Sequence, residues 1–118
     1  MSKVLLGVIL GAVLGVFDGL TALFTPEVRP MIMFILMGST FKGLVAGIII
    51  GIFARKVDSL PWGIIFGLII AILVSLPFAL GTDPNTGKMY FWDIMIPGSL
   101  VGIILGYATQ KYGVKPAA

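Results

Sequence analysis

Residues 60–80 read LPWGIIFGLIIAILVSLPFAL, an apolar run that contains no Asp, Glu, Lys or Arg. Because a helix rises about 1.5 Å per residue, a run of this length crosses the roughly 30 Å hydrocarbon core of a bilayer. In lipid every backbone amide needs a partner inside the protein, and so short a chain meets that need with helices. The run therefore predicts a transmembrane helix.

Three further apolar runs flank this one, and short segments rich in Pro, Asp, Ser and Gly separate the four. The first run is longer than the apolar region of a usual signal peptide, so we expect it to be retained as a transmembrane helix and not cleaved. The sequence predicts an all-α integral membrane protein, a four-transmembrane-helix bundle. We expect a single domain, 1–118, with spans at about 4–24, 31–54, 60–80 and 89–112.

The composition fits a lipid environment and excludes several kinds of chemistry. Of 118 residues, 58% are hydrophobic and 11% are charged, whereas about a quarter are charged in soluble domains. The chain has no Cys and no His, which excludes disulfides, thiolate chemistry, iron–sulfur clusters and His-bound haem or zinc. No nucleophile–base pair is visible. We therefore predict no enzyme activity, no cofactor, no metal site and no nucleic-acid partner.

The positive charges predict the orientation in the membrane. The net charge is +3, and the basic residues lie at the ends of the apolar runs. One side of the membrane receives Lys3, Arg55, Lys56, Lys111 and Lys115, and the other receives Arg29 and Lys88. Because basic loops stay in the cytoplasm, this distribution predicts that both termini are cytoplasmic.

The two halves of the chain resemble each other. Residues 43–56 align with 98–111 at an offset of 55, and residues 7–15 align with 63–71 at an offset of 56. The near-equal offsets predict a duplicated helical hairpin, whose two halves have the same orientation in the membrane. The alternative is that apolar helices with regularly spaced Gly align by chance.

Small residues recur at every fourth position of each run. Four residues advance a helix by 400°, so each stripe stays near one face. The stripes are Gly7, Gly11, Gly15; Gly43, Gly47, Gly51; Gly63, Gly67, Ala71, Ser75, Ala79; and Gly98, Gly102, Gly106. They predict small-xxx-small packing of the glycine-zipper kind, because small residues let helix backbones approach closely in lipid. The stripes either pack the four helices alone or also join copies in a homo-oligomer.

Ionisable residues inside the apolar runs mark a candidate site. A charge at the middle of a bilayer costs roughly 2.5–3.5 kcal/mol, so it is usually paired or lines a wet cavity. Asp18 and Lys42 lie on consecutive antiparallel helices at depths that a Lys side chain can bridge. We predict a polar intramembrane site in the outer half of the bundle. Its members are Asp18, Lys42, Ser39, Thr40 and Asp93.

Three other interpretations of these charges stay open. Asp18 and Lys42 could form a purely structural pair. Lys42 could instead extend alone to the membrane interface, with Asp18 in a shallow turn if the first helix ends at Phe17. The second run could also be broken at Gly38, which would place Lys42 near a boundary.

Two functions fit this chain, and both place it in the lipid bilayer. The first is an oligomeric transporter or channel for a small solute or ion, since four short helices hardly enclose a wet path alone. The alternative is a non-catalytic accessory or assembly subunit that packs against other membrane subunits of a larger complex. The charges within the apolar runs favour transport.

Overall fold

The computed structural model describes residues 2–24, 26–81, 87 and 89–114. Within these residues the chain forms four α-helices and two short 3₁₀-helices. They are α1 (Lys3–Leu20), η1 (Thr21–Phe24), η2 (Pro26–Met31), α2 (Ile32–Lys56), α3 (Leu60–Leu80) and α4 (Phe91–Tyr112). Each α-helix belongs to a segment that is long and apolar enough to cross a membrane. The prediction of an all-helical chain with four candidate transmembrane helices is therefore confirmed.

Local chemistry sets the ends of the helices. Ser2 caps α1, since its hydroxyl accepts a hydrogen bond from the Leu5 amide at 3.1 Å. The first apolar run is helical as far as Phe24, but its last turn has tightened into η1, where the Thr21 hydroxyl donates to the Asp18 carbonyl at 2.6 Å. Pro61 occupies the first turn of α3, where its missing amide costs nothing.

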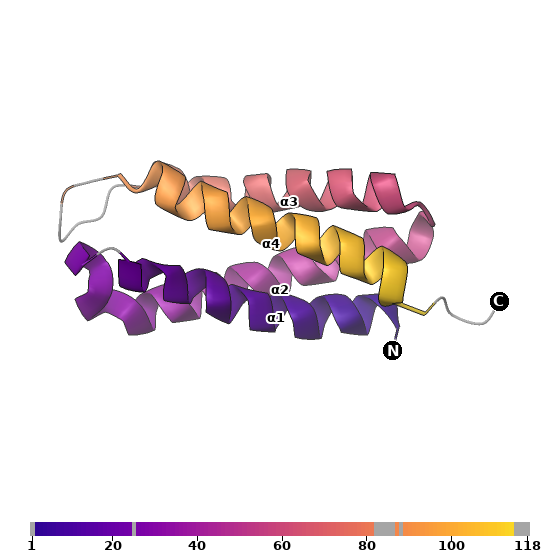
Figure 1. Ribbon diagram of the computed structural model, residues 1–118, viewed down its shortest axis with the longest axis horizontal. Helices are drawn as coiled ribbons and strands as arrows, with labels where there is room; N and C mark the ends of the chain where they lie inside the picture. Colours follow the sequence, from indigo (N-terminus) through magenta and orange to yellow (C-terminus); the bar gives the residue numbers. More distant parts are fainter. Residues whose placement is uncertain (1, 25, 82–86, 88, 115–118) are drawn as a thin grey trace.

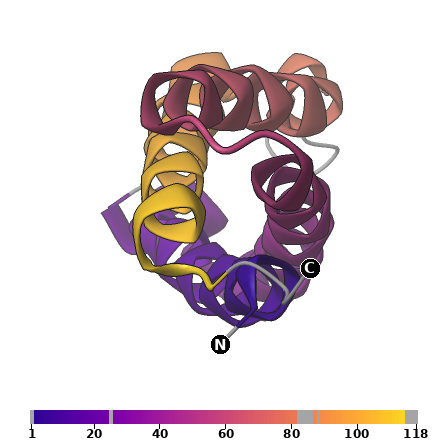
Figure 2. The ribbon, with the colours of Figure 1, turned by 90° about the vertical axis from the view of Figure 1, so that its right-hand side faces the viewer.

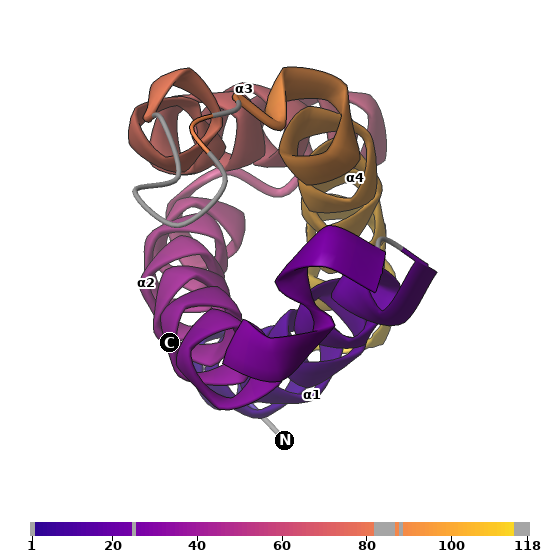
Figure 3. The ribbon, with the colours of Figure 1, turned by 90° about the vertical axis from the view of Figure 1, so that its left-hand side faces the viewer.

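The four helices form two antiparallel hairpins that lie side by side (Figure 1). α1 and α2 make the first hairpin, α3 and α4 make the second, and residues 57–59 connect them. The beginning of α1 and the end of α4 meet at one end of the bundle, where Ser2 and Val114 form a backbone bridge (Figure 2). η1 and η2 lie at the opposite end (Figure 3).

The backbones within each hairpin approach unusually closely at glycines. A Cβ atom added to Gly11 would overlap the carbonyl oxygen of Gly43, and one added to Gly7 would overlap that of Gly47. In the second hairpin, a Cβ on Gly67 would overlap the Gly102 carbonyl oxygen in the same way. No residue with a side chain fits at these contacts without moving a helix.

Small side chains and a few aliphatic ones fill the inside, and large apolar ones cover the outside. The buried core between the hairpins consists of Ala46, Ile50 and Leu105, and side chains such as Phe66 pack against it. The outer surface includes Phe34 and Leu73, which are 79% and 58% exposed. A soluble protein buries such residues, so this surface fits a lipid surrounding.

Candidate functional site

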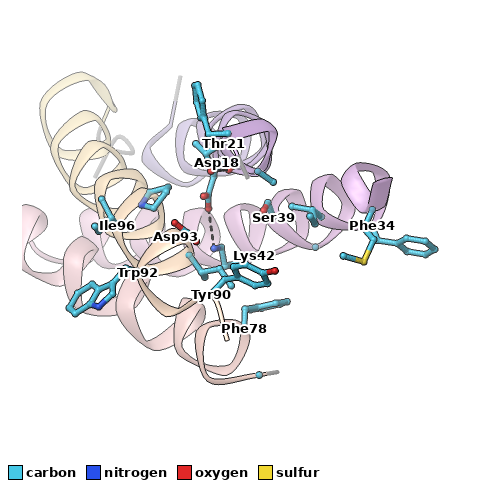
Figure 4. A pocket seen from close by; sticks show the side chains of 18 of the residues that line it. Asp18, Thr21, Phe34, Ser39, Lys42, Phe78, Tyr90, Trp92, Asp93 and Ile96 are labelled. Atoms are coloured by element: carbon cyan, nitrogen blue, oxygen red, sulfur yellow. Dashed lines mark hydrogen bonds and ion pairs between the residues drawn. The ribbon is translucent and has the colours of Figure 1, made fainter. Parts of the chain in front are cut away.

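A cavity of about 850 Å³ lies between the hairpins, at the end of the bundle that carries η1 and η2. This volume lies within the range of pockets that hold drug-sized molecules. The ends of α1 and α3 and the beginnings of α2 and α4 supply its walls (Figure 4). All four helices therefore contribute side chains to one space.

Asp18 and Lys42 form a buried ion pair in the wall of this cavity. The Lys42 Nζ lies 3.0 Å from Asp18 Oδ2, and the two side chains are 9% and 5% exposed (Figure 4). Asp18 comes from the last turn of α1 and Lys42 from the middle of α2, so the antiparallel first hairpin brings them to the same level. Both also border a smaller void deeper in the bundle. The pair thus separates the cavity from the packed core.

This geometry removes two of the open interpretations. Lys42 is buried against a carboxylate, so it does not extend alone to the interface. α1 continues past Phe17 to Leu20, and α2 is continuous through Gly38. The pair therefore lies within regular helices, and the remaining choice is between a structural pair and a functional site.

Two buried oxygens beside the pair lack hydrogen bonds. Asp18 Oδ2 is close to the Lys42 ammonium, but the two groups are not aligned for a hydrogen bond. The Ser75 hydroxyl of α3 also has no partner among the described residues. A buried polar atom without a partner costs about 1–3 kcal/mol and is rare in folded proteins. The Ser75 hydroxyl bears this cost, whereas the Asp18 carboxylate is stabilised by the Lys42 ammonium at 3.0 Å.

Aromatic side chains and a second carboxylate complete the cavity. Phe78, Tyr90 and Trp92 line it, and the Lys42 Nζ lies 5.8 Å from the centre of the Phe78 ring. Asp93 also lines it, from the first turn of α4. The N-terminus of a helix stabilises negative charge, and within the described residues the Asp93 carboxylate forms no ion pair.

A second buried polar cluster closes the opposite end of the bundle. The Lys3 side chain is 2% exposed, and its Nζ donates to the Ala54 carbonyl at 2.9 Å and to Gln110 Oε1 at 3.3 Å. It also lies 3.4 Å from Asp58 Oδ1. Gln110 Nε2 donates to the Val57 carbonyl at 2.6 Å. These contacts tie α1 and α4 to the connection between the hairpins.

The structure brings together four of the five predicted site residues. Asp18, Lys42, Ser39 and Asp93 all line the cavity, whereas Thr40 does not. Its Cα instead packs against Gly15 in the contact between α1 and α2.

The sequence analysis missed two parts of this arrangement. From the sequence, Ser75 is interpreted only as a small packing residue. Lys3 is interpreted only as one of the basic residues that set the orientation in the membrane. A signal for the Lys3 cluster was present, because Gln110 is a polar residue four positions beyond Gly106 in an apolar run.

No family model, curated protein or solved structure matches this sequence significantly.

Proposed function

We propose that this protein is a transporter or channel that carries a small solute or ion across a membrane. The observation behind the proposal is the ion pair of Asp18 and Lys42, buried beside a cavity of about 850 Å³ within candidate transmembrane helices. Ionisable groups are expensive inside a bilayer and typically mark the path of an ion or substrate. An ion pair with a purely structural role would not require a cavity beside it.

The layering along the bundle supports a carrier over a permanently open pore. The cavity and the ion pair come first, then the apolar layer of Ala46, Ile50 and Leu105, and finally the Lys3 cluster. We infer that the structure represents a state closed at the Lys3 end. With both termini in the cytoplasm, the cavity faces the outside, and transport requires the two hairpins to rock against each other.

The close glycine contacts hold each hairpin together as one rigid body for such a movement. We propose that each hairpin is a glycine-zipper unit with small-xxx-small packing, and that the two units arose by duplication. The predicted glycines are buried inside the protomer, so a homo-oligomer must use the bulky outer residues. Oligomerisation remains part of the proposal, because four short helices enclose little more than this cavity.

Flux in proteoliposomes tests the proposal. Currents on a solid-supported membrane would be recorded for monovalent cations, monovalent anions and small charged organic solutes. We expect a protein-dependent signal that is lost in Asp18→Asn and in Lys42→Met, because either change leaves one charge uncompensated on the path. Lys111→Met is the matched control, since within the described part of the chain its ammonium interacts with Tyr107 and Tyr112 at the exposed end of α4. Wild-type flux in Asp18→Asn would refute the assignment of the site.

The accessory-subunit alternative is favoured by one surface feature. Met33, Met37 and Phe41 form an exposed stripe along α2, and Met and aromatic side chains adapt well to protein partners. Native mass spectrometry of protein extracted gently from its own membrane separates the two functions. A single homo-oligomeric mass supports transport, and a stoichiometric complex with other chains supports the accessory role.

A further inference from the structure

The charges on the cavity wall do not balance. Among the described wall residues there are two carboxylates, Asp18 and Asp93, and one ammonium group, Lys42. Lys42 is already paired with Asp18, so among the described wall residues no further basic group is left to pair with Asp93. An added monovalent cation would balance the charges of these described residues, whereas an added anion would raise the imbalance.

Lys42 already makes the contacts that a bound organic cation would make. Its ammonium group touches a buried carboxylate oxygen and lies near the face of Phe78. Aromatic rings attract cations by about 0.5–2 kcal/mol, most strongly where water is excluded. Tyr90 and Trp92 add further aromatic surface to the same cavity.

We propose that the cavity binds organic cations, in which an ammonium group is attached to an aromatic or aliphatic body, and that Lys42 is a tethered competitor for their site. This inference rests on the proposed function, because it names the substrate class of the same cavity. A bound cation takes Asp18, and the displaced Lys42 ammonium turns to Asp93, which also lines the cavity (Figure 4). Two carboxylates then face two cations.

Calorimetry on the purified full-length protein tests the charge preference. The probes are benzyltrimethylammonium and phenylmethanesulfonate, which share an aromatic body and carry opposite charges. We expect the cation to bind at least about tenfold more tightly than the anion, and Asp93→Asn to weaken cation binding by roughly tenfold through loss of one charge contact. Equal binding of the two probes, or tighter binding of the anion, would overturn the proposal.

Lys42→Met tests the competitor role. Removal of the tethered ammonium should tighten binding of benzyltrimethylammonium, because the ligand then meets Asp18 unopposed. Weaker binding in a folded Lys42→Met protein would contradict the proposal. Asp93 is exposed, so Asp93→Asn keeps the charge test available even if the Lys42 variant does not fold.

The two proposals can fail separately. If benzyltrimethylammonium binds with the expected charge dependence but no flux depends on Asp18, the transport proposal fails and the cation site stands. If flux depends on Asp18 but the cation probe does not bind, the substrate class is wrong and transport stands.

Discussion

At the scale of single residues, the Asp18–Lys42 pair has two separable effects, on stability and on binding. Taking two charges out of water is costly, and their mutual attraction roughly offsets that cost. Removing one charge leaves the other buried alone, whereas removing both leaves an uncharged contact. The pair can therefore be dispensable for folding and still be required for function.

A double-mutant cycle measures this separation. We expect Asp18→Asn or Lys42→Met alone to lower the free energy of unfolding by about 3 kcal/mol without loss of helix content. The combined variant should recover most of this loss, because no uncompensated charge remains. Chemical denaturation followed by circular dichroism gives the coupling energy. Additive losses in the combined variant would show that the two charges act independently.

The sequence could predict this pair because it lies on two consecutive helices. Asp18 and Lys42 are at similar depths on antiparallel neighbours, so spacing alone brings them together. Lys3 and Gln110 are 107 positions apart, and their contact depends on how the two hairpins dock. No local pattern encodes that docking, so the cluster emerged only from the structure.

At the scale of the helices, the glycines differ in how much room their neighbours leave. Gly47 of α2 faces the Gly7 carbonyl of α1, and an added Cβ would overlap it. Gly38, on the same helix, would place a Cβ 3.8 Å from the Phe78 ring, which is ordinary contact. The sequence places Gly47 in the stripe with Gly43 and Gly51 and leaves Gly38 outside it, but it does not give the space available at either position.

This difference predicts opposite effects of the same substitution. Gly47→Ala should destabilise the protein by about 1–3 kcal/mol, because the first hairpin must open to accept the methyl group. Gly38→Ala is the matched control and should be neutral or stabilising by roughly 0.5–1 kcal/mol, since Ala favours a helix over Gly. Thermal unfolding of both variants checks the pair. A destabilised Gly38→Ala with a stable Gly47→Ala would contradict the described packing.

At the scale of the whole molecule, the two hairpins meet through a polar contact at one end and diverge around a cavity at the other. Hydropathy predicts the helices, because each run is long and apolar enough by itself. The cavity arises only from the placement of one hairpin against the other, so hydropathy does not reveal it. The Lys3 cluster holds the two hairpins together at the closed end. It should therefore control how readily water-soluble reagents enter the bundle from that end.

Labelling of single cysteines measures that control, since the natural chain has none to interfere. Thr109→Cys places a thiol in the fully buried layer near Lys3, where a membrane-impermeant maleimide should react slowly. Adding Gln110→Leu removes one hydrogen bond to the buried Lys3 ammonium, worth about 1.5–3 kcal/mol, and one to the Val57 carbonyl. It should speed labelling by tenfold or more. Ser39→Cys in the cavity should react at the same rate in both backgrounds. Unchanged labelling of Thr109→Cys would rule out a closing role for the cluster.

The Asp18–Lys42 pair also affects how the protein is made. Both charges belong to the first hairpin, which the ribosome completes before α3 and α4 exist. Inserted one at a time, α1 and α2 would each carry a charge inside the bilayer, at a cost that reaches roughly 2.5–3.5 kcal/mol at its middle. We expect them to leave the translocon together as a neutral unit. Glycosylation mapping of residues 1–56 would then show poorer insertion of α1 in the Lys42→Met chain, although the sequence of α1 is unchanged.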